Sequence, residues 1–206
     1  AYVLPRTLSF VSETANAESL PLGSFVGAQG WSPSSIMKFE RMEIGQEDNG
    51  NKYYSFSTNA YEPNGSNPRY TFQDFPTSVA AGEKLVFNAR VRVPVKGGVA
   101  NWGLRLNNSE VAEFIYYNGY LYDSDFDLGS DGYYGAGAAR TDKSVTANTW
   151  YNLRMEFYAN ADSATGYKVK CYIDDKLVGD HKTASRIPAE ITSAQFYFTG
   201  RANMNS

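Results

Sequence analysis

The sequence predicts an all-β protein, a β-sandwich of two antiparallel sheets that forms a single domain over residues 1–206. Aromatic residues make up 15% of the chain, and such side chains favour strands. Short runs of alternating polarity are separated by clusters of Gly, Asn, Asp and Pro, a pattern typical of strands and turns. Hydrophobic residues make up 42% of the 206 residues, which is enough for one large core. The best candidate for a helix, 34–42, reads equally well as a strand.

The alternating runs indicate where the strands lie. They are expected at 39–44, 52–58, 84–93, 102–107, 112–117, 150–158, 167–174 and 194–199. Asn49 and Gly50, between the first two runs, suit a tight turn because both residues tolerate positive φ. We therefore expect the first two runs to form a hairpin.

Alternation along three of these runs sends apolar side chains inward and polar side chains outward. The outward positions of 84–93, 102–107 and 150–158 include arginines and an asparagine, namely Arg90, Arg92, Arg105, Asn152 and Arg154. Two interpretations are open. These residues form a solvated, ion-paired exterior, or they lie together on a concave sheet face that binds sugar hydroxyls and carboxylates. Such an arginine-rich face favours acidic sugars, although Glu113 and Glu156 on the same side weaken that preference.

Charge and hydropathy limit which classes of partner we expect. The net charge of −3, from 19 basic and 22 acidic side chains, gives no field that attracts nucleic acid. No stretch approaches the roughly 20 apolar residues of a membrane helix, so we expect no membrane partner. The start AYVLPRTLSF lacks the regions of a signal peptide. We expect any targeting segment to have been removed or to belong to a longer parent protein.

Four segments in order, GEKLVFNARVRV, NWGLRLNN, NTWYNLRMEFY and YKVKCYIDDKLVGD, resemble the concanavalin A-like, laminin-G-like jelly-roll domains. In that family a strand with Trp near its start precedes a strand that runs into a short turn. The resemblance covers about residues 35–200. It implies a jelly-roll sandwich, and the family includes lectin-like domains, carbohydrate-binding modules, glycoside hydrolases and polysaccharide lyases.

The sequence contains few residues in the arrangements that catalysis needs. Hydrolases of this fold need two carboxylates that flank the scissile bond, and no strand carries such a cluster. The one histidine, His181, lies in an expected turn, and Cys171 alternates into the core, so neither forms a catalytic triad. We therefore expect no catalytic residues. A lyase that uses tyrosine and arginine stays an alternative, with Tyr116 or Tyr117 as its base.

The string FIYYNGYLYD at 114–123 surrounds an Asn-Gly turn with tyrosines, so at least one ring should be exposed. We expect Tyr117 and Tyr122 to stack on a sugar and Glu113 to fix its orientation. Exposed tyrosines also suit a protein partner, and Trp31, in a loop, carries the same ambiguity.

Carboxylates at every other position, Asp123, Asp125 and Asp127, occur in a run that resembles a calcium loop. The full pattern is not met, because Leu128 replaces the glycine at its sixth position and Tyr134 replaces the closing glutamate. A solvated turn and a structural calcium site are both open. No cofactor is expected to be required.

These features together favour a noncatalytic carbohydrate-binding module that holds a polysaccharide or oligosaccharide on one sheet face. The resemblance implies a secreted or cell-surface setting, as one unit of a larger multimodular protein. The alternatives are a polysaccharide lyase of the same fold and an extracellular adhesion domain that binds protein.

Overall fold

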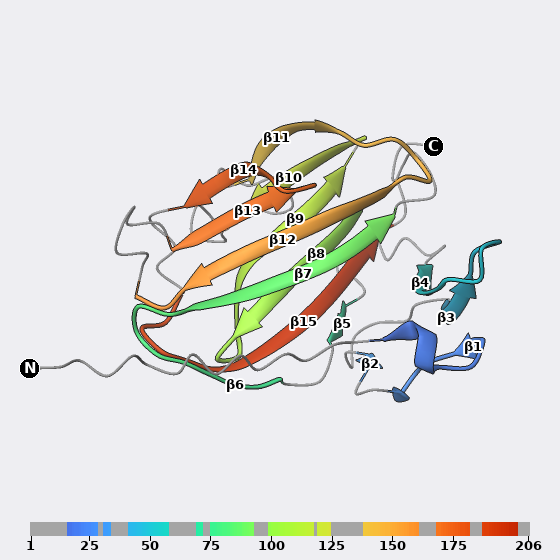
Figure 1. Cartoon of the computed structure of the whole chain (residues 1–206), viewed down its shortest axis with the longest axis horizontal. Coiled ribbons are helices and arrows are strands. Elements are labelled where there is room, and N and C mark those ends of the chain that lie inside the picture. Colours follow the sequence, from blue (N-terminus) through green and yellow to red (C-terminus); the bar gives the residue numbers. More distant parts are fainter. Residues whose placement is uncertain are drawn as a thin grey trace, which may run out of the picture.

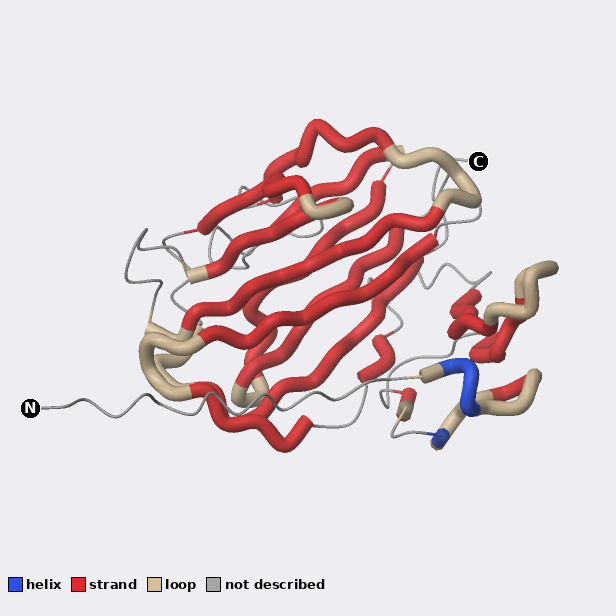
Figure 2. The backbone as a smooth tube through the Cα atoms, viewed as in Figure 1, coloured by secondary structure: helices blue, strands red, loops and turns tan. Residues whose placement is uncertain are grey.

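The computed structural model is almost entirely strand, with one short 3₁₀ turn, η1 (Ala17–Ser19), before the first strand (Figure 2). It describes residues 16–28, 31–33, 41–57, 69–71, 75–92, 99–117, 119–124, 138–160, 168–181 and 187–201. Among these residues, no helix has the length and hydropathy needed to cross a membrane.

Two large antiparallel sheets lie one in front of the other and form the predicted sandwich (Figure 1). The four-stranded sheet has the order β14-β13-β12-β7, with bounds β7 (Lys84–Arg92), β12 (Trp150–Tyr158), β13 (Val169–Ile173) and β14 (Lys176–His181). The eight-stranded sheet has the order β11-β10-β9-β8-β15-β5-β2, and β6 also pairs with β15. Its bounds are β2 (Ser32–Pro33), β5 (Arg69–Thr71), β6 (Phe75–Val79), β8 (Val99–Leu106), β9 (Ser109–Tyr117), β10 (Tyr120–Ser124), β11 (Ala138–Ser144) and β15 (Ile191–Arg201).

The main core fills the space between these two sheets, because the apolar positions of each strand alternate inward. On β8 and β12 the expected inward residues are buried: Trp102, Leu104, Leu106, Tyr151, Leu153, Met155 and Phe157. Cys171 is also fully buried, between Val169 and Ile173 on β13, as alternation predicts. These strands therefore present their polar positions to the two outer surfaces of the sandwich.

A third, small sheet was not predicted, and it lies at one end of the sandwich (Figure 1). It contains β1 (Gly23–Ser24), β3 (Arg41–Gln46) and β4 (Lys52–Ser57). The predicted hairpin between β3 and β4 is confirmed. Its turn is tight, since Gly50 N–H donates to the Glu47 carbonyl at 2.9 Å, but the central residues are Asp48 and Asn49 and not the expected Asn49 and Gly50. Gly50 alone in the connecting loop has positive φ, at +92°.

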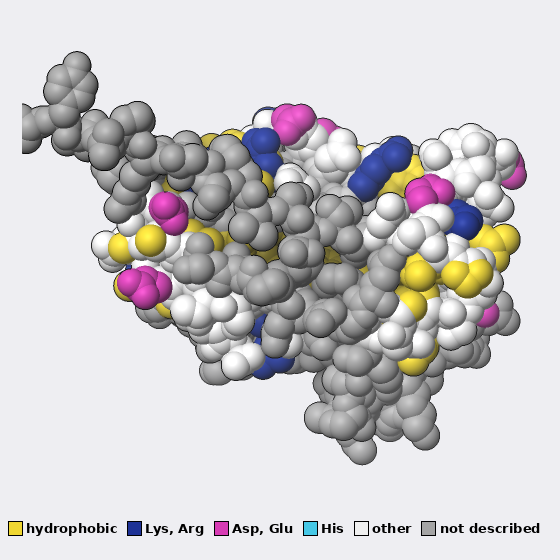
Figure 3. Space-filling model, turned by 60° about the horizontal axis from the view of Figure 1, so that its bottom comes forward, with side chains coloured by type: hydrophobic (Ala, Val, Ile, Leu, Met, Phe, Trp, Pro, Cys, Tyr) yellow, Lys and Arg dark blue, Asp and Glu magenta, His cyan; other side chains and the backbone are white. Residues whose placement is uncertain are grey.

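The small sheet has its own apolar cluster, in which Trp31 is 2% exposed and packs on Phe25 and Tyr54. The interpretation of Trp31 as an exposed recognition residue is therefore wrong. Some apolar side chains of this region do face outward, since Leu22 and Val26 are more than half exposed. Yellow side chains gather at this end of the molecule in Figure 3.

Candidate functional site

The outward residues predicted to share one face lie on two different sheets. Arg90 and Arg92 belong to β7, Asn152 and Arg154 to β12, and these strands are neighbours in the four-stranded sheet. The others, Arg105, Glu113, Tyr117 and Tyr122, belong to β8, β9 and β10 of the eight-stranded sheet. Because the core separates the two sheets, their outer surfaces face opposite ways. The expectation of one shared face is wrong, since alternation predicts in from out but not which sheet a strand joins.

The outer surface of the four-stranded sheet contains a shallow pocket of about 320 Å³. It is lined by Asn88, Ala89, Arg90, Asn152, Leu153, Arg154 and Asp175. Apart from Asp175, its polar side chains come from cross-strand neighbours, because Asn152 pairs with Arg90 and Arg154 pairs with Asn88. The pocket therefore brings two of the predicted arginines together with the predicted asparagine.

Arg90 is exposed and lies over the Trp150 ring, 5.1 Å from its centroid. Among the described residues no acidic side chain pairs with it. The side-chain amides of Asn88 and Asn152 are exposed as well, and no described residue hydrogen-bonds them. The pocket thus offers donors and acceptors that no described residue uses.

Arg154 also lines the pocket. Its guanidinium lies 4.0 Å from the centroid of the Tyr172 ring, and its Nη1 is 3.3 Å from Asp175 Oδ1. Asp175 sits in the β13–β14 turn, where it takes positive φ. The neighbouring Asp174 fastens this turn, because its carboxylate accepts the backbone N–H of Asn152 at 3.0 Å.

Beyond Arg154 on the same sheet face, Glu156 is the centre of a network of hydrogen bonds and ion pairs. The residue is 7% exposed. Its carboxylate accepts the Tyr158 hydroxyl at 2.6 Å and lies 3.3 Å from Lys84 Nζ. Burial alone would raise the pKa of Glu156, but the bonds from Tyr158 and Lys84 and the charges of Lys84 and Arg154 hold it below its ordinary 4.5. Burial and the bond to Glu156 raise the pKa of Tyr158 to about 12.

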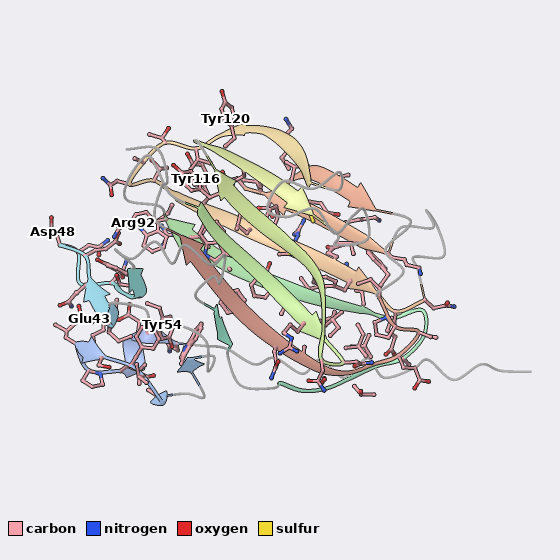
Figure 4. The ribbon with its side chains drawn as sticks, turned by 180° about the vertical axis from the view of Figure 1, so that it is seen from behind. Glu43, Asp48, Tyr54, Arg92, Tyr116 and Tyr120 are labelled. Atoms are coloured by element: carbon pink, nitrogen blue, oxygen red, sulfur yellow. The ribbon has the colours of Figure 1, made fainter. Side chains whose placement is uncertain are left out.

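Arg92 belongs to a junction between the small sheet and the sandwich (Figure 4). Its guanidinium lies 4.9 Å from the ring centroids of both Tyr53 and Trp150, and its Nη1 is 3.2 Å from Glu47 Oε1. The same oxygen accepts Trp150 Nε1–H at 2.7 Å. Gly45 permits this arrangement, since a Cβ there would lie 2.5 Å from the Tyr53 ring. The contacts of Arg92 are therefore internal ones.

On the eight-stranded sheet, Arg105 bonds Gln195 Oε1 at 3.1 Å and the Asn108 carbonyl at 2.8 Å. Glu113 pairs with Gly103 along the backbone, and Tyr117 pairs with Tyr120. Tyr122 lies between Ile115 of β9 and Arg140 of β11. These residues lie across the sandwich from the pocket.

Tyr116, one of the two bases considered for a lyase, is 2% exposed and belongs to the main core. That expectation is wrong, because alternation in β9 places Tyr116 on the same side as the buried Phe114. Figure 4 shows Tyr116 and Tyr120 near one end of β9 and β10.

Asp123 lies in strand β10, where it pairs with Phe114 and Ala139, whereas a turn or calcium loop was expected there. Asp125 and Asp127 lie outside the described residues. Within the described part of the chain, no group of three or more His, Cys, Asp or Glu side chains is placed to hold a metal ion. The calcium site stays a prediction.

No protein-family model and no curated protein matches this chain. Solved structures do match. A sialidase aligns with a TM-score of 0.53 and 14% identity, over 93% of this chain and 16% of its own. The potassium-bound carbohydrate recognition domain of Emp46p aligns at 0.50 and 10% identity, over 92% and 89%. An alginate lyase from Corynebacterium sp. aligns at 0.42 and 15% identity, over 87% and 71%.

The fold is a jelly-roll β-sandwich, which this chain shares with these solved structures. At these identities the likeness is one of fold, and this chain spans about a sixth of the length of the sialidase. The predicted jelly-roll sandwich is thereby confirmed.

Two pocket residues of the jelly roll were absent from the predicted site. Asn88 could have been predicted from the sequence, because alternation with Phe87 and Ala89 places it on the same face as Arg90. Asp175 reaches the pocket only through the β13–β14 turn, and the sequence gives no sign that this turn bends toward β12.

Proposed function

We propose that this jelly-roll domain is a noncatalytic carbohydrate-binding module that holds a polysaccharide or oligosaccharide on the outer surface of the four-stranded sheet. The observation that carries this proposal is a set of pocket groups that no described residue pairs with or hydrogen-bonds: the exposed amides of Asn88 and Asn152 beside the exposed guanidinium of Arg90. Planar donors and acceptors of this kind match the closely spaced hydroxyls of a sugar ring. The fold shared with a carbohydrate recognition domain supports the same class of ligand.

The absence of catalysis is part of the proposal. The pocket lining contains one carboxylate, Asp175, whereas glycoside hydrolysis uses two that flank the bond. The nearby Tyr158 has its pKa raised to about 12, by burial and by its bond to Glu156, which is far above the range of a base at neutral pH. We place the module in a secreted or cell-surface protein with further domains, a setting in which a binding module serves its neighbours.

Affinity electrophoresis through a panel of neutral and acidic polysaccharides tests the proposal, with absorbance near 235 nm read in the same samples. Wild-type protein should be retarded by at least one polymer without a rise in absorbance. The double variant N88A/N152A should lose about ten-fold in affinity for that polymer, the effect of removing two neutral hydrogen bonds.

The matched control is Asn51→Ala, which removes an exposed amide from the loop between β3 and β4, outside the pocket. It should bind like the wild type. Rising absorbance would show a lyase and overturn the noncatalytic proposal. No retardation by any polymer would overturn carbohydrate binding and favour a protein-binding adhesion domain.

A further inference from the structure

The charge of the pocket is uneven. It is lined by Arg90, Arg154 and Asp175, so its own side chains carry one positive charge in excess. Asp175 lies 3.3 Å from Arg154, while no described acidic side chain pairs with Arg90. The unmatched charge is therefore located on Arg90.

The two glutamates that argue against an acidic ligand do not face this charge. Glu113 lies on the eight-stranded sheet, across the sandwich. Glu156 is buried, lies 3.3 Å from Lys84 and 3.8 Å from Arg154, and accepts the Tyr158 hydroxyl at 2.6 Å. Its charge is thus compensated inside the protein, away from Arg90.

The guanidinium of Arg90 is supported from one side. It lies over the Trp150 ring, and Trp150 is fixed by the 2.7 Å bond from its Nε1 to Glu47. A guanidinium stacked on a ring keeps its N–H edge free, and that edge matches the two oxygens of a carboxylate. This geometry suits a fork-like bond better than a neutral hydroxyl.

We propose that the pocket binds the carboxylate of an acidic polysaccharide, with Arg90 as its anchor and with Asp175 as an internal carboxylate that competes for Arg154. This inference rests on the proposed function and names its ligand class. Asp175 is suited to the competing role because its side chain is 85% exposed and its single described ion pair, at 3.3 Å, is the one with Arg154. An exposed pair of this kind is weak and is readily displaced by a better-placed carboxylate.

The test uses matched polymers, each as the sodium salt and as the methyl ester: polygalacturonate, alginate and hyaluronate. Xylan and mannan serve as neutral polymers and dextran sulfate as a sulfated one. Affinity is measured by electrophoresis and by calorimetry at low and high salt. We expect at least one salt form to bind about ten-fold more tightly than its ester, the difference made by one charge-assisted hydrogen bond, and to weaken as salt rises.

Three variants locate the effect. Arg90→Ala should abolish the preference for the salt form, and Asp175→Asn should raise affinity for the salt form by about two- to five-fold while leaving the ester unchanged. Lys176→Ala removes an exposed positive charge next to Asp175 that does not line the pocket, and it should leave the preference intact.

The outcomes separate this inference from the proposed function. Equal binding of salt and ester, or binding of neutral polymers alone, would overturn the acidic ligand and leave carbohydrate binding standing. A preference that survives Arg90→Ala would overturn the anchor, and an Asp175→Asn variant with unchanged affinity would overturn the competition. Dextran sulfate bound as tightly as the best salt form would show general anion capture and overturn the carboxylate. Failure of every polymer to bind would overturn the proposed function itself.

Discussion

The two ends of the outer surface of the four-stranded sheet carry similar residues and differ in how those residues are paired. At one end, Glu156 is buried among Lys84, Arg154 and Tyr158. At the other end, Arg90 is exposed and faces Asn152 across the strands. The first end is closed by its own charges, and the second is left open.

Cross-strand register produces this difference. Glu156 pairs with Lys170 on β13, and Lys84 lies diagonally across on β7, so an acid meets bases on both sides. Arg90 pairs with the neutral Asn152, and no described acid comes within ion-pair distance. The proposed binding site therefore lies where the register leaves Arg90 without an acidic partner among the described residues.

Removing the Glu156 carboxylate, which lies at the centre of the closed end, should have the largest effect on stability. Glu156→Ala leaves the Tyr158 hydroxyl and the Lys84 ammonium without their carboxylate, so we expect a loss of about 2 to 3 kcal/mol in the free energy of unfolding. Urea denaturation followed by fluorescence measures it. Glu190→Ala, at an exposed position, is the control and should change stability by less than about 0.5 kcal/mol.

The Glu156→Ala variant should also change how the free energy of unfolding depends on pH. The pKa of Glu156 is lower in the folded protein than its ordinary 4.5, so its stabilising effect is present above pH 4.5 and is lost as the pH falls below that value. The pKa of Tyr158 rises from 10.0 to about 12, so its contribution is lost between those two values. Glu156→Ala should flatten the acid limb of the stability profile. An unchanged acid limb would show that the network around Glu156 does not stabilise the fold.

The fold was more predictable from the sequence than the site. The strand 150–158 was predicted with its observed bounds, because Leu153, Met155 and Phe157 alternate cleanly with polar residues. Strand β10 was missed, since its sequence reads as a tyrosine-rich turn that runs into an acidic loop, and β11 was missed as well. For the site, alternation identified Arg90 and Arg105 as outward but held no information on which sheet each strand joins.

Loss of the support beneath the open end should have an intermediate effect. Glu47→Ala removes the acceptor of Trp150 Nε1–H and the ion pair of Arg92, so we expect a loss of about 1 to 2 kcal/mol in unfolding free energy. The emission of Trp150 should shift as its environment changes. Asp48→Ala, an exposed neighbour in the same loop, is the control. Equal stability of the two variants would show that the junction does not hold the small sheet to the sandwich.

The boundary between the two ends should contribute least to stability. Asp175 is 85% exposed, so Asp175→Asn removes an ion pair that solvent already screens, and we expect a change of less than about 0.5 kcal/mol in unfolding free energy. Chemical denaturation at low and high salt measures it. A loss above 1 kcal/mol would mean that Asp175 holds the β13–β14 turn in place, as Asp174 does through Asn152. A change below about 0.5 kcal/mol in unfolding free energy is the result expected of a carboxylate that can leave Arg154 when the proposed ligand binds.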